Sequence, residues 1–547
     1  MDARAALRSM LIPLALAQFL ASYDSSSMNV AISQITEDLN TTVTGVQTAI
    51  TVFTLTMAAL MIPGSKLTDI WGRKRCFTMG ITIYGAGAFV TALAPVLGVM
   101  IIGFSLLEGV GSALMIPPIY ILVTVSFPDM ASRARAFAVV SAAGGLGSAS
   151  GPLIGGLITT TITWRASFLM EVLVVAFILY RSRHIEDVRP VGEKPQFDLL
   201  GAILSAAGLV FVVIGILQAG TYGWLKCRKD FVIGDNVILQ QGDISPVVVM
   251  IAVGLGLLGL FYLQIRRRER KHKDPLVATK IFKNRASNLG LVTQNIQWLM
   301  MIGTVFVISL FLQVSRGFNA IETGVVLTAA TVGLLIASTR IKNMALKYSQ
   351  RGIIRSGFVV ALTGVVLVLL LGRATGSVLG FVPGLFLIGF GAGMMLTMSV
   401  NLVQSLWSDE DQGEISGVSR SVSNLGSSLG TAIAGAVLIS ALISGLDSRV
   451  EDSTVLSPEQ KQQFEVVLGN SVSAVSDADV EEALQGQPQE VVDEVVRINR
   501  EARDRALLLA MIAIGVMGLI GLGAAMLLPA GTGPPQREEA SPSSSTT

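Results

Sequence analysis

The chain has 547 residues, of which 51% are hydrophobic and only 14% are charged, and its mean hydropathy is +0.65. Soluble globular proteins carry about 25% charged residues, so this composition excludes a soluble enzyme, a disulfide-linked scaffold and a disordered protein. The net charge of +2 says nothing about partners, because the distribution of charges matters more than their sum. We expect no nucleic acid among the partners.

Fourteen apolar stretches follow one another along the chain. They cover residues 9–33, 43–63, 77–97, 98–126, 135–158, 166–182, 198–220, 247–265, 287–313, 323–341, 354–372, 377–405, 415–445 and 505–529. Each has about 17–30 residues, enough for one helix across roughly 30 Å of hydrocarbon. We interpret the first stretch as a retained helix, since thirteen others follow it. The sequence therefore predicts an all-α integral membrane protein with fourteen transmembrane helices.

The loops between these stretches differ in their basic residues. About 28 lysines and arginines fall on the side of the N-terminus and about 12 on the other side. Cytoplasmic loops carry the excess of basic residues. We therefore expect both termini in the cytoplasm and the protein in the inner or plasma membrane.

A sequence pattern occurs twice. The pattern L-G-S-x-x-G-x-x-I-x-G runs over residues 146–156 and again over 425–435, and residues 109–115 resemble residues 389–395 at nearly the same offset. This predicts two related six-helix bundles, in residues 1–197 and 287–529, with helices 7 and 8 inserted in residues 198–286. Parallel repeats of this kind form transporters whose substrate site lies between the halves.

Two further segments lie outside the membrane in this scheme. Residues 446–504 are polar, and helix starts at Ser457 and Asp477 predict a helical hairpin on the outer face. The hairpin either gates the exit or is a passive linker. Residues 530–547 are expected to form a disordered cytoplasmic tail.

Three carboxylic acids lie within the predicted spans: Asp24 in helix 1, Glu108 in helix 4 and Glu171 in helix 6. A carboxylate in a bilayer costs several kcal/mol unless it is paired, hydrated or protonated, so such residues are candidates for function. We expect Asp24, together with Glu108, to bind the proton and attract cationic substrates. Structural alternatives remain: Asp24 as a polar bend in helix 1, Glu108 as a neutral hydrogen-bond donor, and Glu171 as a hydrated residue near the interface.

The loop after helix 2 places Asp69 before Gly72, Arg73 and Lys74 in a tight turn. This spacing resembles the signature loop of the major facilitator superfamily. The resemblance implies that Asp69 and the basic residues make charged contacts that hold one alternating-access state closed. An ordinary basic cytoplasmic loop is the alternative.

Helix 5 carries the string G-x-x-x-G-P-x-x-G-G, formed by Gly147, Gly151, Pro152, Gly155 and Gly156. Glycines spaced by four allow close helix packing, and a proline frees a backbone carbonyl that permits bending. The string resembles the motif that marks antiporters in the same superfamily. A pure packing role is the competing interpretation.

Helix 1 reads Asp24-Ser-Ser-Ser-Met-Asn29-Val-Ala, which resembles a motif of the fourteen-helix drug:proton antiporters. One position departs from that family. In helix 4 the family has an arginine three residues before a Gln-Gly pair, whereas this chain has Ser105 and then Glu108-Gly109. The family's coupling scheme therefore does not transfer unchanged.

Helices 9 and 12 offer a second surface, on which Trp298, Met398 and Asn401 lie. Methionine and aromatic side chains adapt to varied apolar shapes, which suits a substrate cavity. Packing against lipid or core is equally consistent with each residue alone.

We expect a monomeric exporter of lipophilic or cationic small molecules that is driven by the proton gradient. Its expected partners are the substrate, protons and membrane lipids, and it should need no cofactor or metal. An exporter of one specific metabolite or lipid, or a membrane receptor that transports nothing, are the alternatives. The sequence shows no catalytic cluster of the kind that would indicate an enzyme.

Overall fold

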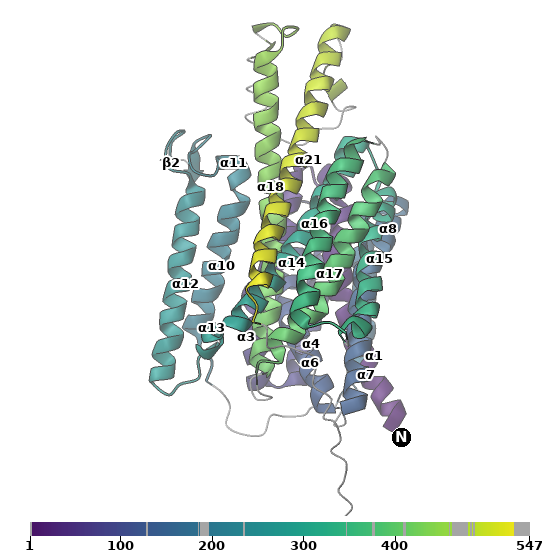
Figure 1. Cartoon of the computed structure of the whole chain (residues 1–547), viewed down its shortest axis with the longest axis vertical. Helices are drawn as coiled ribbons and strands as arrows, with labels where there is room; N and C mark the ends of the chain where they lie inside the picture. Colours follow the sequence, from purple (N-terminus) through teal and green to yellow (C-terminus); the bar gives the residue numbers. More distant parts are fainter. Residues whose placement is uncertain are drawn as a thin grey trace, which may run out of the picture.

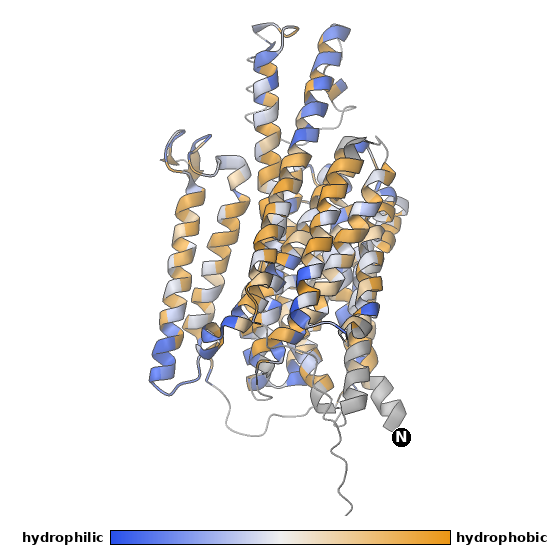
Figure 2. Ribbon diagram, viewed as in Figure 1, coloured by the Kyte–Doolittle hydropathy of each residue, from blue (hydrophilic) through white to orange (hydrophobic). Residues whose placement is uncertain are grey.

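The computed structural model describes residues 3–529 except 127–129, 184, 186–195, 234–235, 346, 375–377, 408–411, 459, 462–479, 482–483 and 485–486. Over these residues the protein is an elongated bundle of helices that run along its long axis (Figure 1). Hydrophobic residues cover the middle of the bundle, and hydrophilic residues gather towards its ends (Figure 2). This distribution suits a chain that crosses a membrane. The predicted tail 530–547 lies outside the described residues.

The first half of the bundle comprises α1 (Ala3–Ser27), η1 (Met28–Val30), α2 (Ile32–Asp38), α3 (Val43–Trp71), α4 (Arg73–Ala92), α5 (Leu97–Met100), η2 (Ile101–Glu108), α6 (Gly109–Ser126), α7 (Met130–Ser150), η3 (Gly151–Gly155), α8 (Gly156–Thr161) and α9 (Trp164–Ser182). The inserted segment comprises α10 (Leu199–Leu217), α11 (Ala219–Tyr222), β1 (Phe231–Ile233), β2 (Asn236–Leu239), α12 (Pro246–Arg270) and α13 (Lys280–Lys283). The second half comprises α14 (Arg285–Leu310), η4 (Phe311–Ser315), α15 (Ala320–Ala345), α16 (Gln350–Ala374), η5 (Val378–Gly380), α17 (Phe381–Gln404), α18 (Gln412–Asp452) and α21 (Gln489–Met526).

Among the described residues, ten helices are long and apolar enough to cross a membrane. Four other long helices, α1, α4, α7 and α9, coincide with predicted spans but are not among these ten. The chain is therefore a multi-pass membrane protein, and the count of fourteen spans stays a prediction.

The two copies of the glycine pattern make the same kind of helix contact. A Cβ added at Gly147 would lie 2.3 Å from the carbonyl oxygen of Phe19, and one at Gly426 would lie 2.2 Å from that of Asn295. Only glycine permits such approaches between backbones. The sequence repeat thus corresponds to a repeated packing, of α7 on α1 and of α18 on α14.

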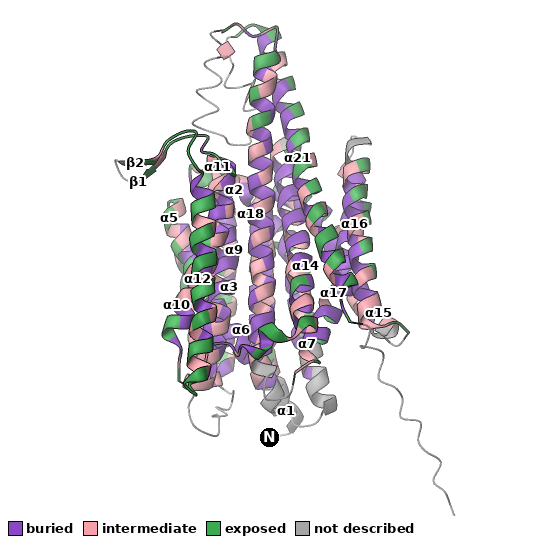
Figure 3. Cartoon of the chain, turned by 60° about the vertical axis from the view of Figure 1, so that its left-hand side comes forward, coloured by how far each residue is buried: buried purple, intermediate pink, exposed green. Residues whose placement is uncertain are grey.

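The inserted helices α10 and α12 pack against each other at one side of the bundle (Figure 1). Much of α12 is exposed (Figure 3), as expected for a helix that faces lipid. Strands β1 and β2 form a short antiparallel hairpin in the loop between these helices.

Helices α18 and α21 project beyond the rest of the bundle (Figure 1). We call residues 446–452 and 489–504 the stalk, and the end of the bundle that carries it the stalk end. The opposite end, where α12 finishes in a run of arginines, is the basic end. The predicted spans end at 445 and begin again at 505, and α18 and α21 each continue as one helix from the bundle into the stalk.

The stalk has its own apolar core. Its buried side chains include Leu446, Val450, Val495 and Ile498, so the helices gain from pairing after they leave the bundle. The predicted helix start at Ser457 is confirmed: its Oγ accepts from the Gln460 amide at 3.3 Å. The predicted start at Asp477 lies outside the described residues.

Candidate functional site

The three predicted acids converge in the first half of the bundle. Asp24 on α1, Glu108 at the end of η2 and Glu171 on α9 each place one carboxylate oxygen within 4.8 Å of the others. All three side chains are buried. We call this group the acid cluster. The sequence placed Glu171 nearer the membrane surface than Asp24 and Glu108. In the structure the Glu171 carboxylate lies beside the other two, and the residue is only 1% exposed.

Two hydroxyl groups hold the acid cluster. The Tyr84 hydroxyl donates to Glu171 Oε2 at 2.7 Å, and the Thr91 hydroxyl donates to Glu108 Oε1 at 3.2 Å. No protein donor among the described residues reaches either oxygen of Asp24. The sequence analysis missed Tyr84 and Thr91; their seven-residue spacing, which puts both on one face of α4, is the signal that could have identified them.

The described residues supply the acid cluster with no compensating positive charge. Among the described residues, no lysine or arginine forms an ion pair with Asp24, Glu108 or Glu171. Adjacent buried carboxylates repel one another, and a shared proton relieves that repulsion. The same oxygens are of the type that hard metal cations prefer. The arrangement can therefore bind and release protons or a small cation.

Glu108 reaches the cluster from a π-helical turn, η2. Such turns are rare and are frequent at functional sites. A Cβ at Gly87 would lie 2.7 Å from Glu108 Cγ, so the glycine of α4 makes room for the acid. Ser105, at the position of the family's arginine, donates instead to the carbonyl oxygen of Ala49 at 2.8 Å and ties η2 to α3.

An aromatic layer separates the acid cluster from the stalk end. Phe53 and Phe104 stack with centroids 4.6 Å apart, and Phe168 meets Phe104 edge-on at 6.0 Å. Trp164 packs edge-on against Phe168 and donates its indole N–H to Asp38 at 2.8 Å. Phe104 and Phe168 each lie about one turn before an acid of the cluster. The layer therefore limits water access from this side.

The helix 1 motif also contacts the second half near the stalk end. The Asn29 side chain bonds within its own helix turn, to the Ser25 carbonyl at 3.3 Å. Its backbone oxygen accepts from Gln313 Nε2 at 2.9 Å and from the hydroxyl of Ser309. Gln313 Oε1 accepts in turn from the Ser33 amide at 3.1 Å. Gln313, on the π-turn η4, thus joins the two halves.

The loop motif lies at the basic end, between α3 and α4. Gly72 has φ +99°, a backbone conformation that favours glycine and lets α4 begin at once after α3. Lys74 Nζ donates to the Arg183 carbonyl at 3.3 Å, a contact within the first half. Asp69 is half-buried and Arg73 follows the turn, and neither shows an ion pair among the described contacts.

The predicted antiporter motif bridges three helices. Gly147 and Gly151 contact α1, and a Cβ at Gly155 would lie 2.7 Å from Ser27 Cβ. Gly156 faces the other half, where an added Cβ would lie 2.6 Å from the Ala320 oxygen. Residues Gly151–Gly155, which include Pro152, form the π-turn η3. The motif therefore packs against the helix that carries Asp24 and also touches the second half.

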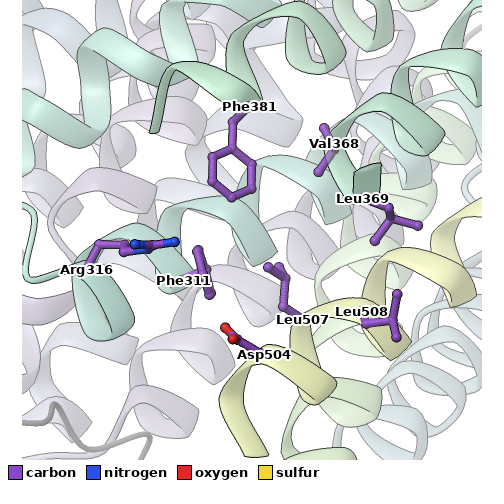
Figure 4. Close-up of a pocket in the computed structure, with 8 residues that line it drawn as sticks. All are labelled: Phe311, Arg316, Val368, Leu369, Phe381, Asp504, Leu507 and Leu508. Atoms are coloured by element: carbon purple, nitrogen blue, oxygen red, sulfur yellow. The ribbon is translucent and has the colours of Figure 1, made fainter. Parts of the chain in front are cut away.

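The predicted cavity residues are less clearly grouped. Met398 is buried, Trp298 is half-buried and Asn401 is exposed, and none of them lines the cavity shown in Figure 4.

The sequence analysis missed one contact between the two halves. Arg420 of α18 donates to the Tyr120 hydroxyl and lies 4.7 Å from its ring. An arginine inside the small-residue helix 415–445 is the signal that could have pointed to it.

Several proteins of known type are similar in sequence to this chain over about three quarters of its length. It is 27% identical to the puromycin resistance protein of Streptomyces alboniger, over 75% of this chain and 78% of the relative. It is 23% identical to a multidrug resistance protein of Mycobacterium tuberculosis, over 75% of this chain and 71% of that protein. The cephamycin export protein of Amycolatopsis lactamdurans is 25% identical, over 74% of this chain and 79% of that protein.

The fold has solved counterparts. A bacterial homologue of the human lysosomal transporter Spinster, solved in an inward-facing, unoccupied conformation, matches with a TM-score of 0.58 and 14% identity, over 95% of this chain and 98% of the other. A sequence profile described as Major Facilitator Superfamily matches residues 14–431. The chain thus belongs to the major facilitator superfamily and is a multi-pass membrane transporter, not an enzyme.

Proposed function

We propose that the protein is a proton-coupled antiporter that exports lipophilic or cationic small molecules by alternating access. Its basic end faces the cytoplasm in this proposal, because cytoplasmic loops carry the excess of lysine and arginine. The protein then lies in the inner or plasma membrane and moves its substrate towards the stalk end.

The acid cluster is the observation that carries the proposal. Three buried carboxyl groups whose oxygens lie within 4.8 Å of one another cannot all be charged without a cation. At least one proton is therefore bound as long as water does not reach the cluster. When the transporter changes conformation and water reaches the cluster, the proton is released. A cationic substrate that approaches Asp24 competes with the proton for the same charge, which is the basis of antiport.

The relatives support export of small molecules. Their printed names refer to puromycin, cephamycin and multidrug resistance. Names such as cephamycin export protein also favour a second candidate function, the export of one specific compound. The two differ in the breadth of substrates that elicit proton movement.

Inside-out membrane vesicles with an acidic interior test the proposal. A panel of lipophilic cations is added outside, and proton release from the interior is recorded for wild type, Asp24→Asn and Glu37→Gln. Glu37 is an exposed acid on α2 of the same half, so Glu37→Gln is the matched control. Elution on size-exclusion chromatography verifies that each variant is folded.

We expect substrate-triggered proton release from wild type and the control, and none from Asp24→Asn. Proton release that persists in Asp24→Asn would contradict the role of the acid cluster. A response that follows a sodium gradient and ignores pH would replace the proton by a metal cation. A response to a single compound of the panel would favour the specific exporter.

A further inference from the structure

A cavity of about 150 Å³ lies at the stalk end of the second half, away from the acid cluster. It is enclosed by η4, the end of α16, the start of α17 and α21 (Figure 4). Phe311, Phe381, Val368 and Leu507 provide apolar walls, and Arg316 and Asp504 provide the charged side chains. Nothing in the transport proposal uses this cavity.

The cavity lies where α21 passes from polar to apolar sequence. Residues 489–505 of this helix carry many charges, whereas residues 506–526 carry none. Nearby side chains on the outside of the bundle are apolar and exposed, including Val366, Leu370 and Ile512. Exposed apolar residues at this density face lipid in a membrane protein. The cavity is therefore at the boundary between the hydrocarbon and the polar head groups.

The two charges of the cavity have opposite sign and come from different elements. Arg316 follows η4 and lies 5.7 Å from the ring of Phe311. Asp504 is on α21, and Figure 4 shows both side chains on the side of the cavity where Phe311 lies. Guanidinium groups bind phosphate well, and carboxylates bind ammonium groups. The pair complements a ligand that carries both a phosphate and an amine.

We propose that this cavity binds the head group of a zwitterionic phospholipid of the phosphatidylethanolamine type. Its phosphate lies at Arg316 and its ammonium group at Asp504. A volume of about 150 Å³ equals that of about five water molecules in the liquid, which suits a head group and excludes a whole lipid. The acyl chains then run over Leu369 and Leu508, which are partly exposed at the cavity.

Lipid binding to the purified full-length chain tests this site without any transport measurement. The protein is delipidated in detergent and incubated with mixed micelles that contain equal amounts of phosphatidylethanolamine and phosphatidylglycerol. Mass spectrometry then counts the lipids that remain bound. The variants are Asp504→Asn, which removes the charge for the amine, and Leu507→Trp, which fills the cavity. Arg505→Gln is the matched control, since Arg505 is the exposed neighbour on α21 and does not line the cavity.

Wild type and Arg505→Gln should retain phosphatidylethanolamine in preference to phosphatidylglycerol. Asp504→Asn should lower that preference about tenfold or more, the factor expected from losing one charged hydrogen bond, and Leu507→Trp should abolish retention. Because Asp504 is exposed, its variant keeps the fold. The proposal is overturned if Asp504→Asn retains the wild-type preference, or if wild type binds both lipids equally. Either result leaves the antiport proposal untouched.

Discussion

Replacing Gly147 by alanine tests whether the packing of the antiporter motif on α1 supports transport. The new Cβ would lie 2.3 Å from the Phe19 carbonyl oxygen and 3.1 Å from the Ser22 Cβ. Ordinary contacts begin at about 3.4 Å, so α7 and α1 must separate by about 1 Å. Asp24 lies on α1 little more than one turn beyond Phe19, and it moves with that helix.

Two opposing energies decide the size of the effect. Overpacking a close contact costs about 1–3 kcal/mol, whereas alanine in place of glycine stabilises a helix by about 1 kcal/mol. The net result is a destabilisation of up to about 2 kcal/mol. Gly256 of α12 has nothing within 4 Å of an added Cβ, so Gly256→Ala should show only the stabilising term.

The assay is the apparent melting temperature at one scan rate, since membrane proteins often unfold irreversibly, together with substrate-triggered proton release. Gly147→Ala should melt a few degrees below Gly256→Ala and lose most of its transport. If Gly147→Ala melts and transports like Gly256→Ala, the close contact has no role and the reasoning fails.

Three further changes probe other parts of the molecule. Thr51 of α3 is fully buried and accepts a hydrogen bond on its backbone oxygen from Ser428 of the second half at 3.1 Å, so a cysteine there reports on separation of the halves. Gln313→Ala removes the bonds to Asn29 and Ser33, and an impermeant maleimide should then modify Thr51→Cys about tenfold faster in a Cys76→Ser, Cys227→Ser background. An unchanged rate would show that Gln313 does not hold the halves together. The Trp164 indole and the Arg165 guanidinium lower the pKa of the Asp38 carboxyl in the folded protein. The charged carboxylate therefore stabilises the fold at pH values above the usual carboxyl pKa of about 4. This stabilisation is lost as the pH falls through the lowered pKa of Asp38. Wild type should therefore lose more melting temperature than Asp38→Asn between about pH 6 and pH 3, and parallel curves would contradict this. In the stalk, Ile498→Ala should cost about 2–4 kcal/mol and Arg449→Ala, which breaks an exposed ion pair with Glu501, less than about 1 kcal/mol, as measured by protease resistance; equal losses would refute the apolar core.

Several features follow from the sequence by itself. Long apolar runs permit few structures other than helices in a membrane, because each buried backbone group needs a partner within its own segment. The repeated glycine pattern indicated the duplicated helix packing, since only glycine lets two backbones approach so closely. Acids within apolar runs stand out because their burial is costly, and so Asp24, Glu108 and Glu171 could be identified without coordinates.

Other features were decided by the tertiary structure. Glu171 joins Asp24 and Glu108 only because α9 packs beside α1 and α4, and η2 packs on α4 as well; sequence distance carries no information on that packing. Tyr84 became a partner of the cluster for the same reason. α18 and α21 continue unbroken from the bundle through the stalk because each covers the apolar face of the other there. The sequence predicted a helical hairpin outside the membrane, whereas only the tertiary structure showed which apolar side chains, from segments some 50 residues apart, pair within it.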